Sequence, residues 1–309
     1  MILAALGGAS PVLNVGAGAG SYEPRDRLVV AVEPSAVMVG QCPPGAAPAV
    51  RAQAEALPFG DGTFGAAMAV LTVHHWSDRA RGLAEMRRVT DGPVVLFVCD
   101  PRRPAWWLHH YFPASRRLEA RRETPLDQLA RLLGRPVEVI PVPVPADCAD
   151  GFNGAYWRRP RAYLEPRVWR PMSALAQIPD ADREEGMHRL RADLDSGEWH
   201  RRWGHLLGLD ELDLGYRVVV AAPPTARYAT SPRRNSAAAR NDSAWPRRTP
   251  ARCQGSRGST SWSCAKPGGS VGITQMREAY RTGYQRRLLL AAMRAGPDAG
   301  TLAGCSCGA

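Results

Sequence analysis

The stretch VLNVGAGAG at residues 12–20 decides the fold of this chain. It is an apolar run that ends in glycines at positions 16, 18 and 20, where the missing Cβ atoms let a ligand approach the backbone. A helix that follows such a turn offers free N–H groups to a polar or anionic ligand. The stretch predicts a strand, a ligand-binding turn and a helix, although glycines also serve simple tight packing at such turns.

Four more apolar runs follow at residues 28–32, 50–54, 66–73 and 94–99. Their apolar residues are continuous rather than alternating, which is typical of parallel strands covered on both faces. Helical segments are expected between them, one opening at residues 35–39 and an amphipathic one at 78–89. This alternation of strand and helix predicts a doubly wound α/β sheet.

The pattern changes after residue 100. Helices are expected at residues 106–112 and 126–133, and residues 150–207 are largely helical in pattern. Prolines interrupt an apolar run at 137–144, so this strand belongs at a sheet edge or its end. Residues 216–221 predict a last strand.

Charge separates the chain into two parts. Residues 226–309 hold 14 basic and 3 acidic side chains, the same excess of +11 that the whole chain carries. This segment is rich in Ser, Arg, Pro, Gly and Ala, without runs that could bury a core, so we expect a disordered basic tail with one basic helix at 274–294. The neutral part, residues 1–225, is expected to form the folded domain.

The cysteines and the apolar runs bear on metal binding and on the cellular compartment. The 7 cysteines form neither a disulfide framework nor paired CxxC motifs, so we predict no metal site. No apolar run is long enough to span a bilayer, and the N-terminus lacks the basic region of a signal peptide. These features indicate a cytoplasmic enzyme.

The spacing of the glycines in the turn favours one class of ligand over another. A dinucleotide fingerprint needs glycine at position 21, where Ser21 stands, so GxGxG favours S-adenosylmethionine (SAM) over NAD. Glu33 closes the second strand, where a carboxylate can accept both ribose hydroxyls. A solvated acid at a strand end is the alternative for Glu33.

Five segments in order carry a family resemblance: LNVGAGAGSYEP, VVAVEPSAVM, AEALPFGDGTF, VLTVHHW and AEMRRV. They resemble the class I SAM-dependent methyltransferases of the ubiquinone/menaquinone-biosynthesis-like group, methyltransferase type 11. The resemblance is good over residues 13–99 and looser to about residue 221. It implies a mostly parallel seven-stranded Rossmann-like sheet, with a SAM-binding half at 1–100 and a helical cap with the last strands at 101–225.

The resemblance also implies a set of SAM-binding positions. Glycine-turn residues would surround the amino-acid part of SAM, the end of the second strand would hold the ribose and adenine, and the next two strand ends would complete the site. Asn14 stands where many relatives carry an acid. The implied positions are Asn14, Gly16, Ala17, Gly18, Gly20, Glu33, Pro34, Ser35, Met38, Ala54, Glu55, Leu71 and Thr72.

His74 and His75 follow the fourth strand at the edge where ligands bind in such sheets. A histidine there suits proton removal from a methyl acceptor near neutral pH, or alternatively caps a helix start. Aromatic residues of the second half either line an acceptor pocket or form core: Trp106, Trp107, Tyr111, Tyr156 and Trp157. Asp147, Cys148 and Asp150 are expected in a surface loop.

The sequence favours a methyltransferase that acts on a small-molecule acceptor, which it does not identify. Only residues 1–10 precede Pro11, so we expect a short cover over SAM and weakened affinity. The alternatives are a nicotinamide-dependent oxidoreductase and an inactive methyltransferase-like protein with a nonspecific basic tail. We expect neither a specific nucleic-acid partner nor a membrane partner, and the oligomeric state is not predicted.

Overall fold

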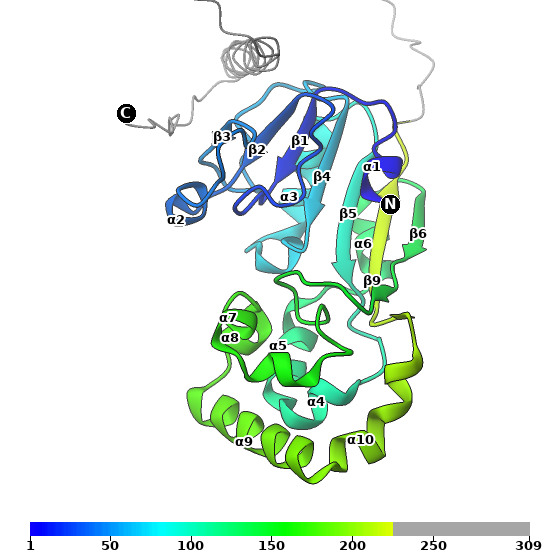
Figure 1. Ribbon diagram of the computed structural model, residues 1–309. Coiled ribbons are helices and arrows are strands. Elements are labelled where there is room, and N and C mark those ends of the chain that lie inside the picture. The colour runs from blue at the N-terminus through cyan, green and yellow to red at the C-terminus, as the bar shows by residue number, and fades with distance from the viewer. Residues whose placement is uncertain (225–309) are drawn as a thin grey trace, which may run out of the picture.

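Seven strands of this chain form one sheet in the order β3-β2-β1-β4-β5-β9-β6 (Figure 1). The computed structural model describes residues 1–224, so the predicted tail at 226–309 lies outside the described residues. The strands are β1 (Val12–Val15), β2 (Val29–Val32), β3 (Ala49–Val50), β4 (Ala66–Val70), β5 (Val94–Cys99), β6 (Val137–Pro141) and β9 (Tyr216–Ala221). Strands β1 to β5 are parallel, and β9 runs antiparallel to both β5 and β6. The expected mostly parallel seven-stranded sheet is confirmed.

The two faces of the sheet bury different side chains. Alternate residues of β1 point to opposite faces: Leu13 and Val15 join the cluster under α3 (Arg79–Arg88) and α6 (Leu126–Leu133). Val12 joins the opposite cluster, which the segment around α1 (Ile2–Ala5) covers. Every residue of β1, β2, β4 and β5 is buried, as continuous apolar runs predict.

Three strand predictions differ from the structure by more than one residue at an end. The third strand was expected at 50–54, but β3 is only Ala49–Val50 at the sheet edge, and the chain then turns. The fourth ends at Val70, because Leu71 adopts a positive φ of 50° and a 3-10 turn, η1 (Val73–His75), begins. The proline-broken run ends β6 at Pro141, at the sheet edge as expected, and its remainder forms β7 (Val144–Pro145), which pairs with β8 (Glu211–Leu212).

Helices from the second half form a cap below the sheet, on the side toward which β4 and β5 point (Figure 1). Its core is the apolar cluster of Trp107, Tyr111, Tyr163, Leu190 and Trp199 with their neighbours. The cap elements are α4 (Trp107–Tyr111), α5 (Pro113–Arg122), η2 (Pro160–Leu164), α7 (Pro166–Trp169), α8 (Ser173–Ala176), α9 (Asp180–Ser196), α10 (Glu198–Trp203) and η3 (Gly204–Gly208). Because the cap faces the carboxyl ends of the parallel strands, it covers the edge where ligands bind in such sheets.

One further helix, α2 (Ala36–Val39), follows β2 and begins at Ser35, whose hydroxyl accepts the backbone N–H of Met38. No helix within residues 1–224 is long and apolar enough to cross a membrane.

Candidate functional site

The glycine turn lies where the strand order reverses. Strand β1 pairs with β2 on one side and with β4 on the other, so the ends of β1 and β4 border a crevice. Gly16 and Gly18 have positive φ values of 69° and 57°. A Cβ atom at Gly16 would collide with the side chain of Thr72, just beyond β4. The turn therefore requires glycine for its backbone conformation and for its close approach to Thr72.

Glu33 ties this turn to the next strand. Its Oε2 accepts the N–H of Gly18 at 2.9 Å, and its Oε1 accepts the N–H of Ser35 at 2.9 Å. The side chain is buried, and it lines a cavity together with the turn. Each carboxylate oxygen can accept a second hydrogen bond. A rigid carboxylate with free acceptor capacity is suited to bind a sugar diol.

Asn14 presents a polar atom without a partner. It is 2% exposed and lines the cavity beneath the glycine turn. Its side chain bonds to Glu23, whose carboxylate also accepts the N–H of Ala47 at 2.8 Å. Asn14 Oδ1 has no partner in the described structure. Because an unsatisfied buried acceptor is costly, this oxygen marks a place for a ligand donor.

Leu71 and Thr72 close the crevice from the β4 side. Leu71 is the one non-glycine residue within 1–224 that has a positive φ, at 50°, a conformation that bulky residues rarely adopt. Its N–H donates to the carbonyl of Phe97 at 2.8 Å, which holds the backbone in this strained form. Backbone strain of this kind concentrates at functional sites, and both residues line the cavity.

The cavity has a volume of about 660 Å³, within the range of small-molecule sites. Thirteen of the fifteen predicted site residues line it: Asn14, Gly16, Ala17, Gly18, Glu33, Pro34, Met38, Ala54, Glu55, Leu71, Thr72, His74 and His75. Gly20 and Ser35 do not. Gly20, with φ 79°, donates its N–H to Ala17 and shapes the turn, while Ser35 caps α2.

Gln53 and Glu55, which follow β3, both line the cavity, and the sequence analysis did not single out Gln53. Glu55 lines the cavity, but its Oε1 accepts the hydroxyl of Ser77 at 2.8 Å and the N–H of Asp78 at 3.0 Å. Burial acts to raise the pKa of Glu55, and these bonds outweigh it and leave the pKa below its ordinary value. Gln53 lies on the same wall with an exposed side chain. Gln53 is therefore better placed than Glu55 to offer hydrogen bonds to a ligand.

The two histidines after β4 both reach the cavity. Burial, the neighbouring His75 ring and Arg122 together lower the pKa of His74 to about 3. Partial desolvation and Arg122 also lower the pKa of His75, which lies at the exposed mouth. The ring centroids are 4.0 Å apart. Both rings are therefore neutral near pH 7, and His74 is a weak base.

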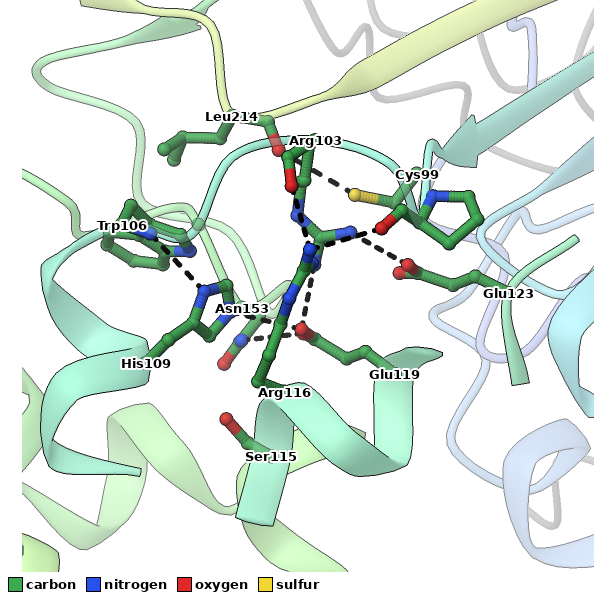
Figure 2. A network of polar contacts seen from close by, with 12 residues as sticks. Cys99, Arg103, Trp106, His109, Ser115, Arg116, Glu119, Glu123, Asn153 and Leu214 are labelled. Atoms are coloured by element: carbon green, nitrogen blue, oxygen red, sulfur yellow. Dashed lines mark hydrogen bonds and ion pairs between the residues drawn. The ribbon is translucent and has the colours of Figure 1, made fainter. Parts of the chain in front are cut away.

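The cap end of the cavity holds a buried polar cluster that the sequence analysis missed (Figure 2). Arg103 donates to Glu119 and to Glu123, each at 2.7 Å. Glu119 also accepts a bond from His109 Nε2 at 3.1 Å and one from Asn153 Nδ2 at 2.8 Å. Glu119, Glu123 and Asn153 line the cavity. We call these five side chains the Arg103 cluster.

The two carboxylates of the Arg103 cluster differ in ionisation. Burial acts to raise the pKa of Glu119, but the His109 bond and the Arg103 charge outweigh it and leave the pKa below its ordinary value. Burial raises the pKa of Glu123 to about 7, with help from the negative charge of Glu119 and against that of Arg103. Such a split between paired carboxylates is typical of acid–base sites.

Asp150 lies in a loop, as expected, and this loop also forms part of the cavity wall. The hydroxyl of Tyr22, from the glycine-turn segment, donates to Asp150 Oδ2 at 2.7 Å, and both residues line the cavity. Burial and the hydrogen bond with Asp150 raise the pKa of Tyr22. This bond links the first half of the chain to the cap across the cavity.

The proposed aromatic acceptor pocket is wrong for this cavity, because none of its five predicted residues lines it. Trp107, Tyr111 and Trp157 are at most 2% exposed. The indole N–H of Trp107 donates to the carbonyl of Trp157 at 2.8 Å, and Trp107 packs edge-on against Tyr163 and Trp199. These rings build the cores of the cap and of the sheet face.

Comparison with known proteins adds an independent result. A family model described as a methyltransferase domain matches residues 13–96. A solved structure from Anabaena variabilis, described as a methyltransferase from an antibiotic biosynthesis pathway, is 36% identical, covers 68% of this chain and 90% of that chain, and has a TM-score of 0.65.

More distant solved structures match as well. A SAM-dependent methyltransferase from Thermotoga maritima is 14% identical, covers 69% of this chain and 81% of that chain, and has a TM-score of 0.40. A methyltransferase from Bacillus halodurans is 15% identical, covers 69% and 92% of the two chains, and has a TM-score of 0.42. A search of the curated proteins finds no match.

Proposed function

Because this chain belongs to the class I SAM-dependent methyltransferases, we propose that its cavity binds SAM at the glycine turn and presents the methyl group to a small-molecule acceptor at the cap end. The observation that carries the proposal is the glycine turn hydrogen-bonded to the buried Glu33 at the reversal of strand order.

The residues on this wall fit SAM in three respects. Asn14 Oδ1, which is buried and unpartnered, would accept a hydrogen bond from the ammonium group of the methionine part. The remaining lone pairs of Glu33 would accept the two ribose hydroxyls. Met38 and Pro34 would provide the apolar surface for adenine, and Gln53 would meet the adenine edge.

When bound, SAM supplies a methyl group already activated on a cationic sulfur. The protein therefore has to bind, orient and exclude water. The close approach of Gly16 to Thr72 fixes the floor of the cavity, and the Tyr22–Asp150 hydrogen bond joins its two sides. Orientation rather than covalent catalysis is what these residues contribute.

A small molecule is the proposed acceptor class, because the cap reaches over the carboxyl edge of the sheet and bounds the cavity. The roles of His74 and His75 as general bases stay predictions, as does a cytoplasmic location. The lowered pKa of His74 makes it the weaker candidate for a proton acceptor at neutral pH.

Calorimetric titration of the purified protein with SAM, S-adenosylhomocysteine (SAH) and NADH tests the proposal. We expect both sulfur nucleosides to bind with 1:1 stoichiometry and NADH not to bind. Saturable binding of NADH without binding of SAH would support a nicotinamide enzyme instead. Absence of binding by all three ligands, in a protein that melts cooperatively, would support the inactive alternative.

A further inference from the structure

We propose that Glu123 is the general base of this enzyme, and that it takes the proton from an acceptor that carries an N–H or O–H group. Glu119 is the fixed carboxylate that keeps Arg103 in place beside it. This inference rests on the proposed function and adds to it the chemical class of the acceptor.

Position is the first argument. Glu119 lies in the last turn of α5 and Glu123 is the residue that follows the helix, so a spacing of four residues puts them on one side of it. They line the same cavity as the glycine turn, at the cap end. An acceptor bound at the cap end would therefore share one cavity with the proposed cofactor site.

The two carboxylates differ in their hydrogen-bond donors. Glu119 has donors on both oxygens: Arg103 and His109 on Oε2, and Asn153 on Oε1. His109 Nδ1 accepts the N–H of Trp106 at 3.3 Å, so His109 donates a hydrogen bond to Glu119 through its Nε2–H group. Glu123 accepts from the Arg103 guanidinium at 2.7 Å and otherwise has only the weak thiol donor of Cys99. A proton that enters this pair therefore goes to Glu123.

Charge leads to the same assignment. Arg103 and both carboxylates are nearly buried, with exposed side-chain fractions of 4%, 8% and 11%. The two carboxylates share the Arg103 guanidinium, and their like charges disfavour the ionised form of the one with fewer donors. The groups that face Glu123 are Arg103 and Cys99 from the β5 end and Glu119 from its own helix. Burial raises the pKa of the Cys99 thiol, so Cys99 stays protonated near pH 7.

The proton balance of the step is simple. A lone pair of the acceptor oxygen or nitrogen forms the bond to the methyl carbon, and the electron pair of the carbon–sulfur bond stays on sulfur. The proton of the acceptor passes to the Glu123 carboxylate, which releases it to solvent after the product leaves. A base with a pKa near the working pH is the most effective, and that of Glu123 lies at about 7, whereas that of His74 lies at about 3.

The lining of the cap end also selects the acceptor. Glu119 and Asp150 accept hydrogen bonds, as Glu123 does in its ionised form, and Asn153, 8% exposed, has an Oδ1 atom without a partner. The one guanidinium on the wall, that of Arg122, donates to Gln177 at 2.6 Å at the rim. This wall suits a neutral or cationic donor group and disfavours a carboxylate or phosphate.

A titration tests the ionisation without turnover. Carbon-13 spectra of the SAH complex, with labelled glutamate carboxyls, should show one carboxyl that titrates near pH 7. The resonance should be missing in Glu123→Gln and present in His74→Asn. If every glutamate of the unaltered protein titrates at about pH 5 or below, the inference is wrong.

Methyl transfer from radiolabelled SAM to two matched probes tests the role. Phenol must lose a proton, whereas pyridine carries none on its nitrogen at about pH 8. We expect Glu123→Gln to slow transfer to phenol at least ~100-fold and transfer to pyridine less than ~3-fold. The rate with phenol should rise with pH through about 7 in the unaltered enzyme and be flat in the variant. Glu123→Asp should restore part of the rate and the pH dependence.

If the protein binds SAH, the proposed function stands. Three results would then overturn the inference about Glu123. One is an equal loss on both probes, which indicates a positioning role. Another is loss of the pH dependence in His74→Asn but not in Glu123→Gln. The third is transfer by the unaltered enzyme to neither probe or only to pyridine, which excludes the acceptor class. Failure to bind SAH would instead contradict the proposed function itself.

Discussion

The two ends of one cavity are built by different means. The cofactor end consists mostly of backbone: a glycine turn, two strand ends and Glu33, all within residues 12–72. The cap end contains buried charged and polar side chains from segments far apart in the chain, such as Arg103, Glu119 and Asn153. Substitutions at the first end should change cofactor affinity, and those at the second should change stability and proton transfer.

The largest expected effect concerns the Arg103 cluster. Glu119→Gln removes the carboxylate that holds Arg103 in a buried setting, which should lower the free energy of unfolding by about 3–5 kcal/mol. Glu123→Gln is the matched control and should cost about 1 kcal/mol or less at pH 6, where Glu123 is already protonated. Urea denaturation of both variants gives the comparison. Equal losses of stability in the two variants would show that Glu119 and Glu123 do not have the different roles inferred for them.

At the cofactor end, Gly16→Val introduces a Cβ that collides with Thr72 in a backbone conformation that valine rarely adopts. We expect SAH affinity to fall by about 100-fold, or about 3 kcal/mol. Gly197→Ala is the control: its φ is 80° but nothing lies within 4 Å, so it should cost about 1 kcal/mol of stability and leave SAH affinity unchanged. Retained SAH binding in Gly16→Val would break the assignment of the turn.

The histidine pair gives a pH-dependent difference. Because the folded-state pKa of His74 is lowered from 6.5 to about 3, the unfolded chain binds more protons in that window, and stability falls as the pH decreases below about 6.5. At about pH 5 the free energy of unfolding should be lower by up to ~2 kcal/mol. Solvent screening of the partly exposed ring makes this loss smaller. His74→Asn should not lose stability in this way. Unfolding of both proteins at about pH 6.5 and about pH 5 measures the difference. An unchanged pH dependence in the variant would mean that His74 is solvated.

The smallest effect is expected for the link across the cavity. Tyr22→Phe removes the hydrogen bond to Asp150 and should cost about 1 kcal/mol, seen as SAH release faster by ~2- to 5-fold in stopped-flow measurements. Asp150→Asn tests the same bond from the other side. The double variant should be no worse than the single ones. Strictly additive losses would argue against a direct link.

The same contrast explains how much the sequence could predict. Strands β5 and β9 and helix α6 have the predicted bounds, because apolar runs and helical periodicity depend on local composition. The ends of β3 and β4 differ because a sheet edge and the strained Leu71 are set by tertiary contacts. Thirteen predicted residues line the cavity, since strand ends and glycine turns locate them directly.

The cap end could not be predicted in this way. In sequence, α5 is PASRRLEARR, which has the composition of a solvated helix. Its buried face carries Ser115 and Glu119, so hydrophobic periodicity gives no indication that this face is inside. Only the packing of Arg103 and Asn153 against it turns a charged helix into a cavity wall. The aromatic residues that suggested a pocket are instead used as core.

One comparison tests the account most directly: SAH affinity measured by calorimetry in Gly18→Leu and in Glu123→Gln, each checked for cooperative melting. Gly18 has a φ of 57° and donates its N–H to Glu33, so leucine there should abolish measurable binding. Glu123→Gln should bind SAH as the unaltered protein does. Retained binding in Gly18→Leu, or its loss in Glu123→Gln, would contradict the division of the cavity into a backbone-built cofactor end and a side-chain-built acceptor end.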